Sequence, residues 1–296
     1  MWYTNRLSMA LNTRLVPRLD IKGPNLVKGI RLEGLRVLGK PERFAAYYYE
    51  QGADELLFVD IVASLYGRNS LLDIIERVSK QVFVPLTVAG GIRSLDDIRS
   101  VLRAGADKVA LNTAAVARPE LVKEASKRFG SSTIVVSIEV IKRGEKYEVY
   151  TDNGRERTNL DALEWAKKVT ELGAGEILLT SVDKEGTGEG FDLELTRLVS
   201  ESVPIPVIAC GGAGKVEHLA AAVVKGKAQA VACASILHYN FVRQFPSDAD
   251  IAPEINTAHI KAGAGYGRIQ DTTLADIRKS MLQSGVRCLH RVGETA

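Results

Sequence analysis

The stretch Val84-Pro85-Leu86-Thr87-Val88-Ala89-Gly90-Gly91 returns later in the chain as Ile205-Pro206-Val207-Ile208-Ala209-Cys210-Gly211-Gly212. Each copy is an apolar run that ends in two glycines, and the second copy lies 121 residues after the first. The same offset aligns residues 53–57 with 174–178 and Gly105 with Gly226. Three collinear matches at a single offset indicate that the chain is made of two related halves.

Short β-branched runs alternate with amphipathic stretches along the chain. The expected strands are 14–19, 56–61, 84–89, 108–111, 133–140, 176–180, 207–210 and 228–232. The expected helices are 41–51, 70–80, 95–104, 119–129, 160–172, 193–201, 216–225 and 274–283, with capping residues before 95 and 274. Several strands are apolar on both faces, as in a parallel sheet covered by helices. We predict an α/β fold, a (β/α)8 TIM barrel built from two duplicated half-barrels; an open doubly wound sheet is the alternative.

The composition is that of an ordinary globular protein. Hydrophobic residues make up 46% and charged residues 25% of the 296 residues, which excludes disordered, collagen-like and coiled-coil proteins. The net charge of +3 is too small to indicate a nucleic-acid partner. Cys210, Cys233 and Cys288 form no CxxC pair, which is typical of a reducing compartment and disfavours disulfides or a zinc site. The histidines lack ligand spacing, so we predict no metal and no other cofactor.

No targeting or membrane-spanning segment is evident in the sequence. Residues 1–13 contain no apolar run long enough for a signal core, and the longest apolar stretches have the length of strands. We therefore expect a cytoplasmic protein without membrane contact. We also expect an N-terminal extension over 1–13 and a single barrel over 14–296, with an inserted segment at about 237–273. This insert is far longer than an ordinary connection, and it forms either a lid or a surface or oligomer loop.

The two Gly-Gly turns predict two phosphate sites. They end the third and seventh strands, and a small polar residue follows the next strand in each half; the residues concerned are Gly90, Gly91, Asn112, Thr113, Gly211, Gly212 and Ser235. Glycine lets backbone N–H groups approach an anion closely, and a helix start adds a favourable dipole. Two such sites indicate a ligand with a phosphate at each end. The alternative is that the glycines only permit tight turns.

Carboxylates complete the predicted site. Asp20 closes the first strand, and Glu139 closes the fifth, half a barrel away. Two carboxylates on opposite sides of a barrel mouth can act as general acid and base on one substrate; the alternative is buried structural ion pairs. Further candidates for substrate binding are Asp60 after the second strand, Asp183 after the sixth and Lys28 in the loop after Asp20. Asp60 and Asp183 can equally hold loops, and Lys28 can equally be an ordinary solvated charge.

Seven motifs between residues 14 and 238 carry a family resemblance. They are Leu19-Asp20-Ile21-Lys22, Leu26-Val27-Lys28-Gly29, Ala53-Asp54-Glu55-Leu56, Asp60-Ile61-Val62-Ala63-Ser64, Gly90-Gly91-Ile92-Arg93-Ser94, Ala104-Gly105-Ala106-Asp107-Lys108-Val109 and Gly173-Ala174-Gly175-Glu176-Ile177-Leu178-Leu179-Thr180-Ser181. With these motifs the chain resembles the cyclase subunit of imidazole glycerol phosphate synthase, a lyase of histidine biosynthesis.

The resemblance implies a barrel that takes ammonia and a ribulosyl-formimino aminoimidazole carboxamide ribonucleotide. The implied products are imidazole glycerol phosphate and an aminoimidazole carboxamide ribonucleotide. This substrate carries two terminal phosphates, in agreement with the twin sites predicted above. By position, Asp20 matches the family's first catalytic aspartate and Lys28 its loop lysine, and Thr180 in a matched motif is expected to bind substrate.

The resemblance also implies a partner. The family obtains ammonia from a separate glutaminase subunit, of the class I glutamine amidotransferase type, docked on the N-terminal face of the barrel. A ring of charged residues gates the passage there, and the matching positions in this chain are Arg14, Glu55, Lys108 and Glu176. Their joint retention favours an ammonia channel; in a solitary barrel they would form a salt-bridged plug.

Three departures from the family pattern lie at the active-site face. Glu139 and Glu185 stand where aspartates are expected, and Ala89 stands where the pattern has a third glycine. Each glutamate adds one methylene, and a displacement of about 1 Å can weaken catalysis markedly. Two alternatives to the cyclase are therefore a paralogous ammonia-using subunit that amidinates a surface-polysaccharide sugar, and a non-catalytic barrel that activates a glutaminase. The sequence leaves open the acceptor, the role of 237–273 and any assembly beyond a heterodimer.

Overall fold

Eight parallel strands close into a barrel in the computed structural model, which describes residues 12–63, 71–245 and 268–289. In order around the barrel they are β1 (Arg14–Lys22), β4 (Leu56–Asp60), β5 (Leu86–Ala89), β6 (Lys108–Leu111), β7 (Ile134–Arg143), β10 (Glu176–Ser181), β11 (Val207–Cys210) and β12 (Ala230–Cys233). Each strand pairs in parallel with the next, and β12 pairs with β1. The predicted (β/α)8 barrel is confirmed, and the alternative of an open sheet is wrong.

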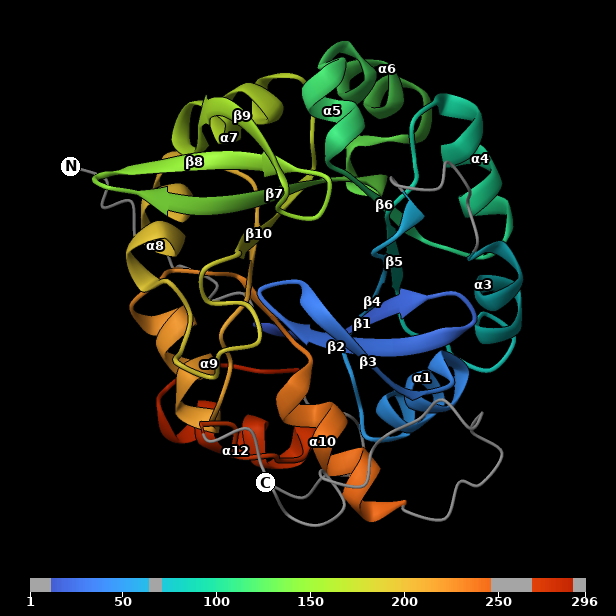
Figure 1. The fold of residues 1–296 in the computed structure, drawn as a ribbon, viewed down its shortest axis with the longest axis vertical. Helices are drawn as coiled ribbons and strands as arrows, with labels where there is room; N and C mark the ends of the chain where they lie inside the picture. Colours follow the sequence, from blue (N-terminus) through green and yellow to red (C-terminus); the bar gives the residue numbers. More distant parts are fainter. Residues whose placement is uncertain (1–11, 64–70, 246–267, 290–296) are drawn as a thin grey trace, which may run out of the picture.

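Helices surround this barrel (Figure 1). Those that match the predicted stretches to within a few residues are α1 (Pro41–Glu50), α3 (Leu72–Val78), α4 (Leu95–Arg103), α6 (Glu120–Phe129), α7 (Ala162–Glu171), α8 (Leu193–Ser202), α9 (Val216–Val224) and α12 (Leu274–Gln283). The two predicted caps form: Ser94 Oγ accepts from Asp97 N, and Thr273 and Asp276 make a reciprocal capping box. Within the described ranges, no helix is long and apolar enough to cross a membrane.

Two hairpins that the sequence analysis did not predict extend the first strand of each half. The strands β2 (Asn25–Ile30) and β3 (Glu33–Gly39) continue antiparallel from β1, and β8 (Lys146–Thr151) and β9 (Glu156–Asp161) continue from β7. In Figure 1 the two hairpins lie on opposite sides of the barrel opening. The internal repeat is therefore visible in the fold as well as in the sequence. Lys28, which we expected in a loop, lies on β2.

Helical structure also occupies parts of the chain that were expected to be loops. A short helix, α5 (Thr113–Ala117), follows β6, and α10 (Ser235–Gln244) takes up the beginning of the predicted insert. Most of that insert, residues 246–267, lies outside the described residues, as do residues 1–11 of the expected extension. Past the gap the chain packs against the barrel, where Gln270 N donates to Gly214 O at 2.7 Å.

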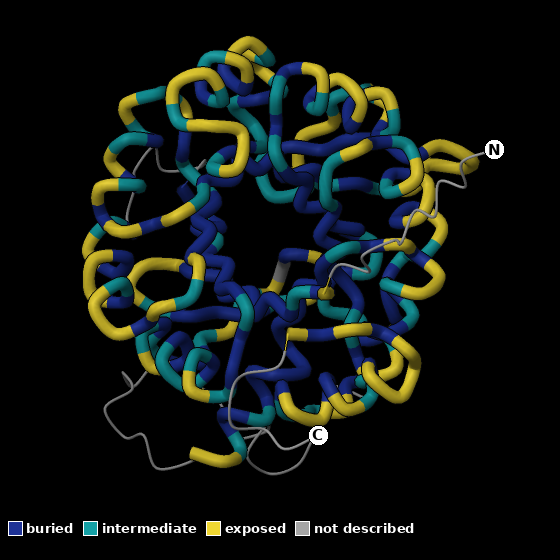
Figure 2. Tube along the Cα trace, turned by 180° about the vertical axis from the view of Figure 1, so that it is seen from behind, coloured by how far each residue is buried: buried dark blue, intermediate teal, exposed yellow. Residues whose placement is uncertain are grey.

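The inside of the barrel is built in layers, because alternate residues of each strand point inward. At the strand starts, the inward side chains are charged or polar. Above them lies an apolar layer formed by Val16, Leu57, Ala89, Ala110, Val135, Leu178, Ile208 and Ala230. Charged residues return at the strand ends. A second and larger apolar core fills the space between the strands and the helices. Figure 2 shows this arrangement as a buried inner wall with the exposed residues on the outer turns.

Candidate active site

Asp20 is held between two cations at the carboxyl end of β1. Arg18 Nε donates to its Oδ1 at 2.7 Å, and Lys28 Nζ lies 3.2 Å from its Oδ2. Lys28 also forms an ion pair with Glu185 in the loop after β10. Burial opposes the ionisation of Asp20, but Arg18 and Lys28 outweigh it and lower the pKa of this carboxyl to about 2. Asp20 is therefore ionised at neutral pH.

Glu139, on β7, has the opposite environment. Its side chain is half-buried, and the described residues give it no cation as an ion-pair partner. Its Oε2 accepts a hydrogen bond from Gly154 N at 2.8 Å. Burial raises the pKa of Glu139 to about 7, although Arg18, the Gly154 N–H and Asn112 favour its ionised form. A carboxyl group with a pKa near 7 can give or take a proton at neutral pH.

The two carboxylates face each other across the barrel. The strands β4, β5 and β6 separate β1 from β7 in one direction, and β12, β11 and β10 separate them in the other. Two carboxyl groups whose environments push their pKa values apart are the usual basis for assigning an acid and a base. Asp20 is, however, only 2% exposed, because Arg18 and Lys28 cover it.

A large cavity lies beside the first Gly-Gly turn and has a volume of about 440 Å³. Its lining includes six of the predicted site residues, namely Asp60, Gly90, Gly91, Asn112, Thr113 and Glu139. The wall also holds two buried polar atoms without a hydrogen-bond partner, Asn112 Oδ1 and Asn153 Nδ2. Buried polar atoms are rarely left unpaired, so these two favour a polar ligand in the cavity.

The corresponding space beside the second Gly-Gly turn is almost closed. It measures about 10 Å³ and is lined by Arg18, Glu185, Gly211, Gly212 and Ser235, among others. Gly190 N donates to Gly212 O at 2.7 Å, so the loop after β10 packs directly on this turn. Gly212 has a φ of +107°, and a Cβ there would lie 2.1 Å from Gly190 O.

The glycine turns therefore have a packing role in both halves. Gly90 has a φ of +96°, and a Cβ on it would lie 2.2 Å from Asp60 O. Both positions therefore require glycine for the packing of the turn. Phosphate binding at the two turns stays a prediction, and it is compatible with the open cavity beside Gly91.

Two predicted binding residues contact the protein rather than either cavity. Asp183 Oδ2 accepts from Lys142 N at 2.8 Å, close to the turn of the β7–β8 hairpin. Thr180, on β10, is buried and lies opposite Cys210 in the pairing of β10 with β11. Neither residue is part of the lining of the two spaces described above. Their roles in substrate binding stay predictions.

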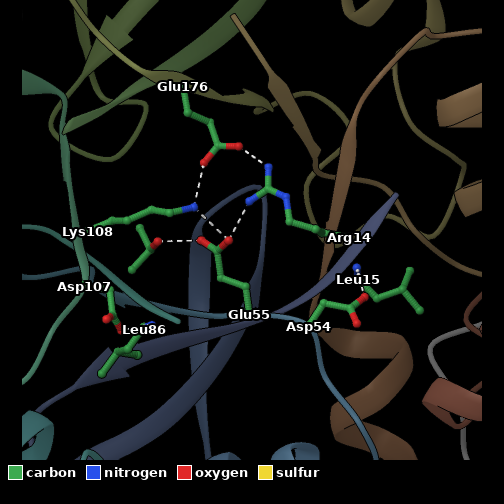
Figure 3. Close-up of polar contacts among 9 residues, drawn as sticks. Arg14, Leu15, Asp54, Glu55, Leu86, Asp107, Lys108 and Glu176 are labelled. Carbon is green, nitrogen blue, oxygen red and sulfur yellow. Dashed lines mark hydrogen bonds and ion pairs between the residues drawn. The ribbon is translucent and has the colours of Figure 1, made fainter. Parts of the chain in front are cut away.

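The four predicted gate residues form a closed ring of ion pairs at the opposite end of the barrel (Figure 3). Arg14 NH1 lies 2.5 Å from Glu55 Oε2, and Lys108 Nζ lies 2.9 Å from the same oxygen. Lys108 Nζ also lies 3.1 Å from Glu176 Oε2, and Arg14 closes the ring by an ion pair with Glu176. Thr87 Oγ1 donates to the remaining Glu55 oxygen at 2.6 Å.

The ring lies where the strands begin. Arg14, Lys108 and Glu176 are the first residues of β1, β6 and β10, and Glu55 directly precedes β4. Nearby aspartates hold the strand starts together, since Asp54 accepts from Leu15 N and Asp107 from Leu86 N (Figure 3).

The model of the histidine biosynthesis protein family matches residues 14–243. The chain belongs to this family. One relative, the imidazole glycerol phosphate synthase subunit HisF of Legionella pneumophila, is 58% identical over 208 residues, which are 70% of this chain and 98% of that protein. The resemblance inferred from the motifs is thus confirmed, and the family match ends within α10.

Some site residues escaped the sequence analysis. Arg18 is part of none of the motifs. Only its position two residues before Asp20 indicates that its side chain also points into the barrel. Asp152 and Asn153 line the large cavity from the turn between β8 and β9, both with positive φ. The string Asp152-Asn153-Gly154 is a strong turn signal and would have revealed this hairpin. Among the described residues, no group of three or more His, Cys, Asp or Glu side chains is arranged to hold a metal ion.

Proposed function

We propose that this protein is the cyclase of imidazole glycerol phosphate synthase, with Asp20 and Glu139 as its base and acid. The 58% identity to HisF supports the cyclase function in histidine biosynthesis. The observation that carries the residue assignment is the pair of opposed carboxyl groups, one ionised and one with a pKa near 7, at the same end of the barrel. No comparison supports the sugar-amidinating or non-catalytic alternatives.

The proposed reaction needs one proton acceptor and one proton donor. Ammonia must lose protons as its nitrogen replaces the ketone oxygen of the ribulosyl half, which leaves as water. The same nitrogen bonds to the formimino carbon as the bond from that carbon to the aminoimidazole nitrogen breaks, and the departing nitrogen must gain a proton. Asp20 suits the first task because its two cations keep it ionised, and Glu139 suits the second because it is largely protonated below pH 7. Since Lys28 and Arg18 cover Asp20, turnover requires the β2–β3 hairpin that carries Lys28 to move away.

The two ends of the substrate would bind at the two Gly-Gly turns. The cavity beside Gly91 has room for one phosphate, and Asn153 Nδ2 is an unpaired hydrogen-bond donor in its wall. The space beside Gly212 opens only if the loop after β10 withdraws, and Glu185 in that loop pairs with Lys28. The same movement that uncovers Asp20 would therefore make room for the second phosphate.

A glutaminase subunit is the proposed source of ammonia. The HisF relative is named as a subunit, and the closed charge ring lies on the face opposite the mouth. We propose that the glutaminase docks over this ring and that the protein works in the cytoplasm. The three cysteines are all free and buried, which is compatible with a reducing compartment.

The deciding experiment measures turnover of the bisphosphorylated ribulosyl substrate with ammonium salts, at a constant concentration of free NH3. We expect Asp20→Asn and Glu139→Gln each to lower kcat by about 10²- to 10⁴-fold. Glu164→Gln, an exposed acid on α7, is the matched control and should keep the wild-type rate. Wild-type protein that leaves the substrate unchanged would refute the function, and full activity in both site variants would refute the residue assignment.

A further inference from the structure

Arg18 is a buried cation to which neither a motif nor the family resemblance assigns a role. It lies two residues before Asp20 on β1, so the two side chains enter the barrel on the same face. Only 4% of the Arg18 side chain and 3% of the Asp20 side chain are exposed. Burying a guanidinium group is unfavourable unless it is paired, so this arginine must gain from its neighbours.

The contacts of Arg18 fix it in one orientation. Its Nε donates to Asp20 Oδ1 at 2.7 Å, and its NH1 lies 3.2 Å from Cys210 Sγ on β11. It shares the wall of the small cavity with Cys210 and Ala232, whose short side chains leave space for the long arginine. The guanidinium is therefore anchored to two strands of the barrel wall, β1 and β11, rather than to a loop.

The two cations beside Asp20 come from different elements of the fold. Lys28 comes from the β2–β3 hairpin and is shared with Glu185, so it leaves Asp20 when the hairpin moves. Arg18 comes from β1 itself, the strand that also carries Asp20 and that is paired on both sides within the closed barrel. Asp20 consequently keeps Arg18 as a partner in any position of the hairpin.

We propose that Arg18 is the positioning residue for Asp20, the fixed counter-ion that keeps this carboxylate ionised and its Oδ1 in place when Lys28 is withdrawn for turnover. This inference rests on the proposed function, in which Asp20 accepts a proton. The low pKa of Asp20 agrees with it, because Arg18 is the largest influence that favours the ionised form. Arg18 also lowers the pKa of Glu139, whose burial raises it.

The test is a double-mutant cycle between Arg18 and Asp20, measured by kcat, KM and pH profile at constant free NH3. We expect Arg18→Met to lower kcat by about 100-fold with little change in KM, because the carboxylate loses its alignment. The pKa of the buried Asp20 then rises, so activity should fall as the pH is lowered from neutral, in a range where the wild type shows no such loss. Arg18→Lys should have a higher kcat than Arg18→Met and should not lose activity at acid pH.

Repeating the Arg18 substitution in the Asp20→Asn variant makes the result decisive. If Arg18 acts only through Asp20, then adding Arg18→Met to Asp20→Asn causes no further loss of kcat. Additive losses would overturn the proposal, as would a loss confined to KM, which would instead make Arg18 a ligand of the substrate phosphate. Should Arg18→Met fail to fold, the kcat of Arg18→Lys can still be compared with that of the wild type. The kcat of the Arg18→Met/Asp20→Asn double variant can be compared with that of Asp20→Asn.

Two controls separate this inference from the proposed function. Arg77→Met removes an arginine from an exposed ion pair with Glu42 and should keep the wild-type rate. If the wild type does not convert the substrate, the proposed function fails. If the wild type converts it and Arg18→Met has the same kcat and pH profile, only the role of Arg18 fails.

Discussion

At the scale of single residues, the two proposed catalytic acids owe their different ionisation to their surroundings. Asp20 meets Arg18 and Lys28 in a buried setting, whereas Glu139 meets a backbone N–H and an amide. The positions of both acids could be predicted, because each closes a strand in an equivalent part of the two halves. Their ionisation could not, because burial sets it for Glu139, while for Asp20 it depends on Arg18, which is part of no motif, and on Lys28 from a hairpin absent from the predicted elements.

Glu139 should destabilise the fold at high pH. Its pKa rises from 4.5 to about 7 on folding, so between these values the folded state holds a proton that the unfolded state has lost, and stability falls as the pH rises. Glutamine does not titrate. As the pH is raised from 4.5 to 8, the unfolding free energy of Glu139→Gln should increase relative to that of the wild type. We expect this increase to be about 1–3 kcal/mol, because solvent partly screens the half-buried carboxylate.

Urea unfolding at the two pH values measures this difference. Glu164→Gln is the control, since its carboxylate is exposed on α7 and should give the same difference from wild type at both pH values. Parallel stability curves for Glu139→Gln and the wild type would show that Glu139 has an ordinary pKa in the folded protein. That result would also remove the reason for making it the proton donor.

At the scale of elements, regular amphipathic helices and short buried strands could be predicted from the sequence. Elements whose apolar residues do not recur at a regular helical or strand spacing could not. The β2–β3 and β8–β9 pairs contain register shifts, which interrupt the alternation that marks a strand. The helix α10 is buried on almost every side, including Ile236, Leu237, His238 and Phe241, so it lacks the polar face that marks a surface helix.

The loop after β10 depends on Gly212. An alanine there would adopt a left-handed backbone and place its methyl group 2.1 Å from Gly190 O. Gly144, in the turn between β7 and β8, has a φ of +59°, but an added methyl group there would meet no atom within 4 Å, so it is a matched control for backbone strain alone. We expect Gly144→Ala to cost about 1–2 kcal/mol. Gly212→Ala should cost about 1–3 kcal/mol more, because it also overpacks the loop.

Urea unfolding of both variants gives the comparison, with turnover as a second measurement. Gly212→Ala should also lower activity, because Glu185 sits in the displaced loop. Equal destabilisation by the two substitutions would mean that the loop is free to shift away from the turn at no cost. In that case the packing of Gly190 on Gly212 would not hold the second half of the mouth closed.

At the scale of the whole molecule, the barrel separates two charged layers by its full depth. The ring of Arg14, Glu55, Lys108 and Glu176 closes one end, and the carboxylates occupy the other. The internal repeat explains part of this plan, since Glu55 and Glu176 are equivalent residues of the two halves. The two cations that join them have no such relation, and their positions came from the family resemblance rather than from the repeat.

Removing one cation from the charge ring should lower stability but leave turnover with ammonium salts nearly unchanged. Lys108→Met leaves Glu55 and Glu176 with one cation between them, and we expect it to lower the unfolding free energy by about 1–3 kcal/mol, less than for a fully buried pair because Lys108 is partly exposed. Turnover with ammonium salts should stay within about twofold of wild type, because the substrate binds at the far end. Lys108→Arg keeps the charge and serves as the control.

Urea unfolding and the ammonium assay together check this expectation. A large loss of ammonium-dependent turnover in a stable Lys108→Met protein would contradict the separation of the two ends. With a glutaminase and glutamine as the nitrogen source, the same variant should lose turnover more strongly than with ammonium salts. Equal rates from both sources would count against the ring as the entrance for ammonia.

The aliphatic band between the two ends has a consequence for any small base that travels along the barrel axis. Val16, Leu57, Ala110 and Leu178 offer neither a counter-ion nor a hydrogen-bond acceptor to a protonated amine, which would lose its hydration without compensation. An uncharged amine escapes most of that loss. Nitrogen arriving through the barrel would thus reach the mouth with its lone pair free, having left a proton on the solvent side of the ring.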